Sequence, residues 1–498
     1  MVYDAAVRPV ILVVALAACG DEGPACEPKT ELLDGPLGDP YELTLPENCV
    51  HGGLEAVPGR WFVSDTDTRF YFQYPRFEGS CGTGFRRSFA APDDRDASDG
   101  TTFVTWSDGT RYFERTQYGS GAVSAQAYCM LPDGTLAGID VTMFENDRYL
   151  TTLTGKPFGP KDELAQGLVL VGELGTDATG ARMRGIDVAV DGNFAYLGTF
   201  TGLEVIDVSK PATPLAVSHF IGPTNDVAIV HGDGRTVAYV SPFGRKTTRA
   251  IDVTDPRAPT VVAEIPDYSH TLFHATRNGG SQIYLATYTN DIPEFDVSHP
   301  LTPVRIGTTK VPGAEAGVHD MFVDDDRIYA NNTTAGMVAF DVSGGLDRPV
   351  QLGHIPTTYS HTSVAATAGG RPVVLHGDEG FTGSDGGAFL RILDGDRSSP
   401  TYFTELARYQ SRREVGIHNF QLVGNRLYIA YYQDGVRVID LADPAHPVEV
   451  AHYNTWDPLT APGGAFEGAL TVQVVGDLIF VSDDLRGLLI LRDPALAP

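Results

Sequence analysis

The C-terminal two thirds of the chain repeats one pattern of apolar and polar positions. A short apolar run ends in an aspartate, and Ser or Thr and then proline usually follow, as in the stretch from Gly202 to Pro211. The aspartate returns about every 44 to 53 residues, with further short runs of alternating character in each period. A fixed period of this length with several strands in it is typical of β-propeller blades. The repeated aspartates are Asp207, Asp252, Asp296, Asp341, Asp394, Asp440 and Asp493.

Each period predicts four strands, and the first period is the clearest. Its strands are expected at 185–190, 194–198, 202–208 and 215–220. The last period stops after its third strand, near Asp493, whereas an extra apolar strand at 167–174 precedes the first period. Pairing these two strands would close the ring and protect its edges. The sequence therefore predicts a seven-bladed β-propeller closed by an N-terminal outer strand.

The region before the propeller has a different pattern. Aromatic residues alternate with polar ones, and Asp-Gly turns at Asp108 and Asp133 predict antiparallel hairpins. We expect a small β-sandwich or barrel-like domain, stapled by disulfides. The all-β chain is thus divided into a signal peptide (1–18), a tether (19–48), a small β domain (49–158) and the propeller (165–498).

Two phrases of the first period resemble a known family. The stretches from Gly202 to Pro211 and from Asn193 to Leu197 look like those of the LVIVD-repeat proteins. The resemblance covers roughly residues 165–495 and departs most in the fifth period, where Asp394 lacks the usual ending. It implies a propeller on the outside of a bacterial or archaeal cell, and it implies no agreed activity.

The recurrent aspartate has a structural explanation. Its carboxylate can accept backbone N–H bonds in the turn that follows. Seven aspartates in the same outer turn of seven separate blades cannot converge on one ligand. We therefore expect these residues to hold turns.

The N-terminus predicts export. An apolar run too short to span a membrane ends in Leu16-Ala17-Ala18-Cys19, which resembles the lipobox of bacterial lipoproteins. That resemblance implies a lipid on Cys19 and a lipid-anchored, extracytoplasmic place in the bacterial cell envelope. An ordinary signal peptide is the alternative. The formal charge of −28 argues against a nucleic-acid partner.

Four further cysteines lie before residue 130, which is an even number in an exported chain and so predicts two disulfides. Three pairings are open, of which we favour Cys26–Cys49 and Cys81–Cys129.

Four histidines begin the predicted inner strands of four successive blades: His270, His319, His361 and His418. Glu-apolar-Gly-apolar-His precedes Asp320 and Asn419, and Tyr-Ser-His-Thr surrounds the other two histidines. Because inner strands line the central channel, the four imidazoles are expected to face one another at its mouth. Imidazole suits Fe, Cu, Zn or Ni, and nearby polar side chains could orient the rings. The candidates for this orienting role are Glu315, Glu414, Asp320 and Asn419.

Two functions remain open. The first is a non-enzymatic, lipid-anchored surface propeller that binds a protein or a glycan and contains no certain cofactor. The second is a metal-dependent enzyme, redox or hydrolytic, with a divalent transition metal at the four histidines. A purely structural role for these histidines, or a pH-sensitive one, is the alternative to metal binding.

Overall fold

The chain is all-β and divides into two compact units. One short 3-10 helix, η2 (Pro494–Leu496), is the only helix among the described residues, and none of these residues form a helix able to cross a membrane. The computed structural model describes residues 31–32, 45–50, 60–65, 84–87, 94–96, 102–107, 111–117, 123–144, 147–158 and 160–497, except 178, 243–246, 313–316, 358, 381–387 and 458–465.

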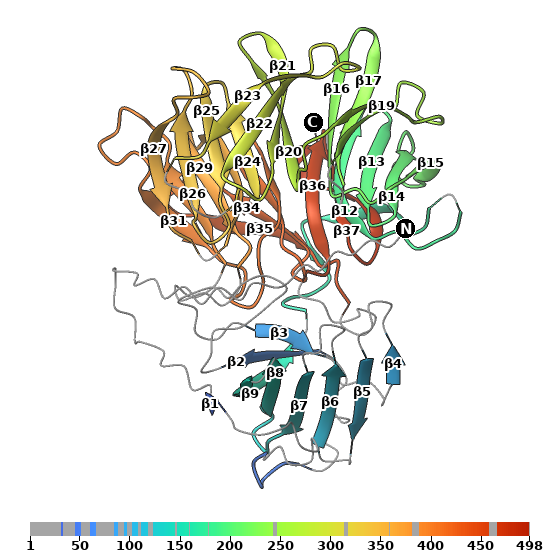
Figure 1. The fold of residues 1–498 in the computed structure, drawn as a ribbon, viewed down its shortest axis with the longest axis vertical. Helices are drawn as coiled ribbons and strands as arrows, with labels where there is room; N and C mark the ends of the chain where they lie inside the picture. The colour runs from blue at the N-terminus through green and yellow to red at the C-terminus, as the bar shows by residue number, and fades with distance from the viewer. Residues whose placement is uncertain are drawn as a thin grey trace. The chain divides into compact units, whose positions relative to one another are not determined.

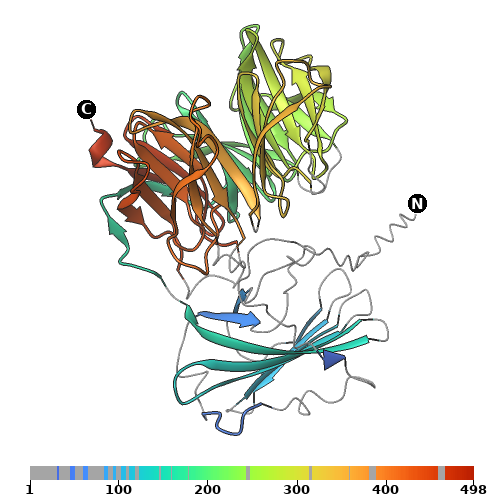
Figure 2. The same cartoon turned by 90° about the vertical axis from the view of Figure 1, so that its left-hand side faces the viewer.

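The first unit is built on one sheet. Its strands are β1 (Glu31–Leu32), β2 (Arg60–Asp65), β3 (Gly84–Arg87), β4 (Asp94–Asp96), β5 (Thr102–Ser107), β6 (Arg111–Gln117), β7 (Val123–Met130), β8 (Leu136–Phe144) and β9 (Asp147–Phe158). The order is β3-β2-β9-β8-β7-β6-β5-β4, with β1 also paired to β9. Figure 2 shows the long strands of this sheet as strongly curved. The expected small β domain is present, and its described strands form one curved sheet.

A disulfide links Cys49 to Cys129, with Cα atoms 5.6 Å apart. The favoured pairing of Cys49 with Cys26 and of Cys129 with Cys81 is therefore wrong. The backbone explains the observed bond, because Val50 donates its N–H to the carbonyl of Met130 at 2.8 Å and so holds residue 49 beside the end of β7. Cys26 and Cys81, like Cys19, lie outside the described residues.

The second unit is a propeller of seven sheets, which follow one another in colour from green to red in Figure 1. Blade 1 has β12 (Gly185–Asp191), β13 (Phe194–Thr199), β14 (Gly202–Asp207) and β15 (Leu215–Ile221). Blade 2 has β16 (Asp226–Gly232), β17 (Arg235–Ser241), β18 (Thr248–Asp252) and β19 (Thr260–Ile265). Blade 3 has β20 (Thr271–Arg277), β21 (Gly280–Ala286), β22 (Asp291–Asp296) and β23 (Val304–Lys310).

The remaining four blades keep this order. Blade 4 has β24 (Asp320–Asp324), β25 (Arg327–Asn331), β26 (Met337–Asp341) and β27 (Val350–Ile355). Blade 5 has β28 (Ser360–Ala368), β29 (Arg371–Asp378), β30 (Leu390–Asp394) and β31 (Glu405–Tyr409). Blade 6 has β32 (Phe420–Val423), β33 (Arg426–Ala430), β34 (Val436–Asp440) and β35 (Val448–Tyr453). Blade 7 has β36 (Ala469–Val475), β37 (Leu478–Asp483) and β38 (Gly487–Arg492).

The ring closes as predicted, and the segment before the closing strand also pairs with a second blade. Strand β11 (Val169–Leu174) pairs with β38, with Leu170 opposite Leu491, and supplies the outer strand of blade 7. The short strand β10 (Ala165–Gln166) adds a fifth strand to blade 6, with Ala165 opposite Tyr453. The buried Arg437 donates to Asp162 at 2.6 Å and so anchors the segment just before β10. One N-terminal segment therefore completes two adjacent blades.

Apolar side chains fill the spaces between neighbouring blades. One core cluster joins Tyr196 and Val205 of blade 1 to Ala238 and Ile251 of blade 2, and all four side chains are at most 2% exposed. Third strands are buried on both faces, which explains the uninterrupted apolar runs in the sequence.

The repeated aspartates hold turns, as predicted. In all seven repeats the Oδ1 atom accepts a hydrogen bond from the backbone N–H two residues further on. At Asp207 the Ser209 hydroxyl adds a second hydrogen bond at 2.6 Å, and these two bonds lower the pKa of the carboxyl.

Candidate functional site

The four histidines occupy equivalent places in blades 3 to 6. His270 and His319 directly precede β20 and β24, His361 is the second residue of β28, and His418 lies just before β32. The backbone N–H groups of three of them donate to the last residue of the second strand in the same blade, at 2.7 to 3.0 Å. These bonds place all four imidazoles at the same end of the inner strands.

The structure brings the four rings together. The ring centroids of His270 and His319 are 4.3 Å apart, those of His319 and His361 are 4.4 Å apart, and those of His361 and His418 are 4.3 Å apart. Two imidazoles bound at right angles to one metal ion have centroids about 4.5 Å apart, because the metal–nitrogen distance is about 2.1 Å. Neighbouring rings thus have the spacing of ligands around a common ion.

The glycine of the shared Glu-apolar-Gly-apolar-His string has a steric function. A Cβ atom on Gly317 would lie 2.1 Å from the carbonyl oxygen of Tyr288, and one on Gly416 would lie 2.2 Å from that of Glu379. Each glycine therefore lets the turn of the preceding blade come close to the histidine strand. The Tyr288 ring lies 4.5 Å from that of His270, so the turn adds its own side chain to the cluster.

Burial keeps the imidazoles neutral. Desolvation lowers the pKa of His270 to about 3 and that of His418 to about 4. Desolvation and repulsion between the histidines hold the pKa of His319 and His361 well below the ordinary value. The neutral imidazole is the form that binds metal ions.

Glu379 also belongs to the cluster, although the sequence analysis did not place it beside the histidines. It follows β29 directly, its Oε1 accepts a hydrogen bond from the hydroxyl of Tyr432, and its Oε2 lies 3.8 Å from Nε2 of His361. Burial raises the pKa of Glu379 to about 7. Aligning the turns between the second and third strands of the blades would have pointed to Glu379. In blades 3 and 6 the corresponding turns contain Tyr288 and Tyr432.

Several nitrogen atoms of this cluster are buried without a partner. Both ring nitrogens of His361 and Nδ1 of His319 have no hydrogen bond among the described residues, although these side chains are only 1% and 4% exposed. One ligand atom from each of His319, His361 and Glu379 lies within 4.8 Å of the other two. Two imidazoles and a carboxylate at this spacing suit a first-row transition metal ion.

Two of the four residues expected to orient the imidazoles, Asp320 and Asn419, make hydrogen bonds to other residues. Asp320 accepts a hydrogen bond from the Thr271 hydroxyl at 3.3 Å, and Asn419 donates to the Thr471 hydroxyl at 3.2 Å. These two bonds join neighbouring inner strands. Glu414 is buried, and Glu315 lies outside the described residues.

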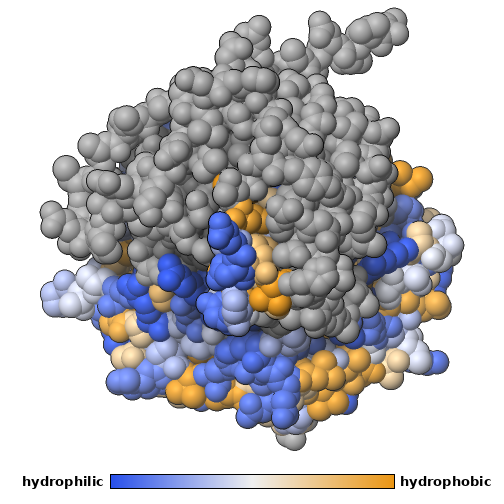
Figure 3. Space-filling model, turned by 90° about the horizontal axis from the view of Figure 1, so that it is seen from below, coloured by the Kyte–Doolittle hydropathy of each residue, from blue (hydrophilic) through white to orange (hydrophobic). Residues whose placement is uncertain are grey.

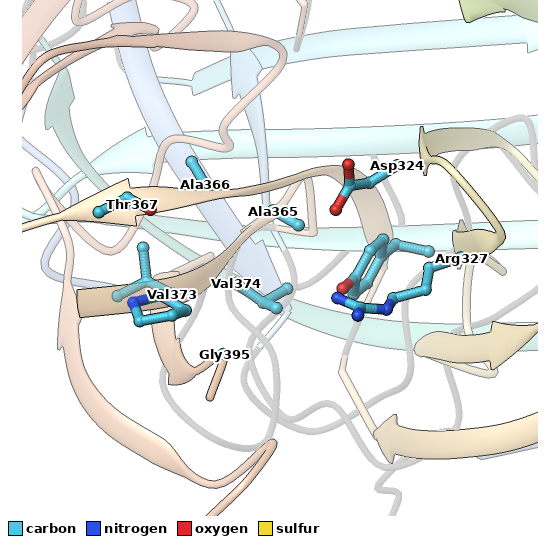
Figure 4. Close-up of a pocket in the computed structure, with 10 residues that line it drawn as sticks. Asp324, Arg327, Ala365, Ala366, Thr367, Val373, Val374 and Gly395 are labelled. Atoms are coloured by element: carbon cyan, nitrogen blue, oxygen red, sulfur yellow. The ribbon is translucent and has the colours of Figure 1, made fainter. Parts of the chain in front are cut away.

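A pocket lies away from the imidazoles, between blades 4 and 5. Figure 4 shows Asp324 and Arg327 on one side of it and Val373 and Val374 on the other. Its volume is about 290 Å³. Asp324 ends the strand that begins beside His319, so this pocket is at the opposite end of the inner strands.

The family model described as LVIVD repeat matches residues 185–220 and 418–455, which are blade 1 and most of blade 6. The chain is thus a β-propeller that carries LVIVD repeats. A search of curated proteins finds no match.

Solved structures share the fold at low sequence identity. Raptor from Chaetomium thermophilum is 11% identical with a TM-score of 0.50, and the match covers 65% of this chain and 29% of Raptor. The WD40 β-propeller domain of Doa1 gives 12%, a TM-score of 0.47 and coverages of 66% and 98%. BamB from Moraxella catarrhalis gives 12%, a TM-score of 0.38 and coverages of 74% and 91%.

Proposed function

We propose that this propeller is a metalloprotein that binds one first-row transition metal ion in the histidine cluster, with His319, His361 and Glu379 as ligands. The observation that carries the proposal is the buried imidazole of His361: neither nitrogen makes a hydrogen bond of good geometry among the described residues, although the backbone of His418 is near enough to raise its pKa slightly. Leaving a buried polar atom unpaired costs about 1–3 kcal/mol. A bound ion would be coordinated by one of these nitrogens and by the buried carboxylate of Glu379.

His270 and His418 stand on either side of the three proposed ligands. Neither belongs to the group of ligand atoms that lie within 4.8 Å of one another, and Nδ1 of His418 donates to the carbonyl of Leu470 at 2.7 Å, so both residues border the site. An open position on such an ion would activate water or dioxygen, so the reaction class would be hydrolytic or redox. The proposal therefore names the site and its ligands and leaves the substrate open.

Metal analysis of the purified protein tests the site. We expect His361→Leu to hold about one equivalent less of Fe, Cu, Zn or Mn than the wild type. The exposed His446 provides the control, since His446→Ala should keep the metal. Metal-free wild-type protein after growth with all four metals, or full metal in His361→Leu, would refute the proposal.

The metal-free stability of the same variant separates a metal ligand from a structural histidine. Replacing an unpaired buried polar group with an apolar one of similar size is neutral or stabilising. His361→Leu should therefore unfold at the same or a higher denaturant concentration than the metal-free wild type. A loss of more than about 2 kcal/mol would indicate that His361 has structural partners in the fold.

We also propose that the protein is exported and anchored by a lipid on Cys19. The lipobox-like sequence and the Cys49–Cys129 disulfide support this location, because disulfides persist in oxidising compartments. The full-length protein should partition into the detergent phase of a Triton X-114 extract, and Cys19→Ala should move it to the aqueous phase. Equal partitioning of the two proteins would contradict the anchor.

A module that binds a protein or a glycan is the second candidate. Every turn between first and second strands is two residues long, as from Asp191 to Phe194. Most connections at the histidine end are longer, notably those from Asp378 to Leu390 and from Tyr453 to Ala469. Binding residues concentrate on such loops. On the face seen in Figure 3, the coloured apolar residues are scattered among hydrophilic ones, so that face gives no reason to place the partner there.

Screening the exported protein against a glycan array and an envelope-protein pull-down tests this candidate, with Asp324→Asn at the opposite end as the control. Binding that is lost when residues 381–387 are replaced by a short turn, which leaves the proposed ligand Glu379 in place, would support it, and unchanged binding would contradict it.

A further inference from the structure

We propose a second metal site on blade 1, formed by Asp177, Glu204 and His219, that takes a divalent ion such as Zn²⁺ or Mn²⁺. One ligand atom from each of the three residues lies within 4.8 Å of the other two. The site is independent of the histidine cluster, because all three residues belong to blade 1 or to the segment that leads into it.

Glu204 is the central residue of this site. It lies in β14, directly opposite His219 in β15, and its side chain is completely buried. Its Oε1 is hydrogen-bonded to Nδ1 of His219, while its Oε2 is buried with no hydrogen-bond partner among the described residues. A buried carboxylate oxygen without a donor is costly, and a cation beside it would remove that cost.

The imidazole of His219 is held in place by the backbone. A Cβ atom on Gly202 would lie 2.5 Å from Cε1 of His219, so only glycine lets the ring lie over the start of β14. Nδ1 is the ring nitrogen that faces Glu204, so an ion shared with Glu204 would bind Nδ1 and replace the hydrogen bond between the two side chains.

Asp177 comes from a small hairpin that follows the closing strand β11. The bridge between Thr176 and Arg182 forms the hairpin, and Oδ1 of Asp177 accepts hydrogen bonds from the backbone of Thr179 at 2.8 Å and of Ala181 at 2.9 Å. The Thr179 hydroxyl binds the same oxygen. These bonds to Oδ1 fix the position of the carboxylate.

The charges of the three groups favour a cation. Two carboxylates, one of them completely buried, meet one imidazole at this site. Carboxylate and imidazole together suit borderline divalent ions. A bound ion would tie the hairpin after β11 to blade 1 and so reinforce the closed ring.

Titration of the full-length protein with Zn²⁺, after removal of metal with a chelator, tests the inference. In the His361→Leu background, which lacks the proposed ligand at the other site, we expect one equivalent to bind. Asp177→Asn should abolish this binding and leave the fold intact, because the asparagine keeps Oδ1 for the turn and loses the charge of Oδ2.

A matched control is available at Asp233, whose carboxylate pairs with His299 at 2.8 Å on the surface without a third ligand. Asp233→Asn should bind Zn²⁺ as the parent does. If His361→Leu fails to fold, the same two substitutions are made in the wild-type protein. The number of Zn²⁺ ions bound per chain should then be one lower in Asp177→Asn than in the wild type and unchanged in Asp233→Asn. Zn²⁺ binding that is absent in the parent, or equal in Asp177→Asn and the parent, would overturn the inference.

Discussion

Replacing Gly416 with alanine tests the link between blade contact and the metal site. The added methyl group would lie 2.2 Å from the carbonyl oxygen of Glu379, and real Cβ contacts stay above 3.0 Å. The φ angle of Gly416 is outside the left-handed region, so the backbone itself tolerates alanine. The whole effect should therefore come from the collision with the neighbouring blade.

The magnitude follows from what has to move. The two backbone segments must separate by at least about 0.8 Å, and overpacking of this kind costs about 1–3 kcal/mol. The Glu379 N–H bond to Tyr359 at 2.9 Å and the Ile417 N–H bond to Asp378 at 3.1 Å would weaken, at up to about 1 kcal/mol each. We expect a loss of about 2–4 kcal/mol in the free energy of unfolding.

Urea denaturation followed by circular dichroism measures this loss. Gly344→Ala is the control, because the nearest atom to its added methyl group would be 4.0 Å away, and this variant should stay within about 0.5 kcal/mol of the wild type. Gly416→Ala should also bind metal at least tenfold more weakly, since Glu379 is displaced. A Gly416→Ala protein with wild-type stability would refute the reasoning about blade contact.

Three further outcomes are expected. Burial raises the pKa of Glu294 to about 6, so ionisation of its carboxyl opposes folding, and Glu294→Gln should remove a fall in stability of about 2 kcal/mol between about pH 4.5 and 6, measured as the difference between the variant and the wild type in pH-dependent unfolding. Asp341→Ala should cost about 1 kcal/mol in urea denaturation through loss of its turn, and Asp341→Asn should cost less; equal losses would argue against the turn. Reducing the Cys49–Cys129 bond, which closes 80 residues, should destabilise the N-terminal sheet by up to about 4 kcal/mol and leave propeller unfolding unchanged in calorimetry.

The propeller could be predicted because its signals repeat. Seven aspartates mark seven turns, and the unmatched strands near Leu170 and Leu489 had only each other as partners. The two-residue strand β10 was missed, since Ala165 and Gln166 carry no periodic pattern and their pairing depends on blade 6 being already formed.

The candidate site was predictable in part. The position shared by His270, His319, His361 and His418 in their blades was enough to expect that they meet. Glu379 was not predictable from local pattern, because it reaches the cluster through a turn whose path depends on Gly416 in the next blade. The disulfide pairing was wrong for a related reason: Cys49 meets Cys129 through the fold of a sheet, and closeness in sequence favoured other partners.

The order of synthesis gives the closing contacts a consequence for folding. Asn454 donates to the carbonyl of Asp162 across a sequence separation of 292 residues, and Arg486 reaches Glu173 across 313. The first segment of the propeller must therefore wait until nearly the last residue has left the ribosome before it finds its neighbours. Contacts so distant in sequence form slowly. Each blade can pair its own neighbouring strands early, whereas closing the ring is necessarily a late step.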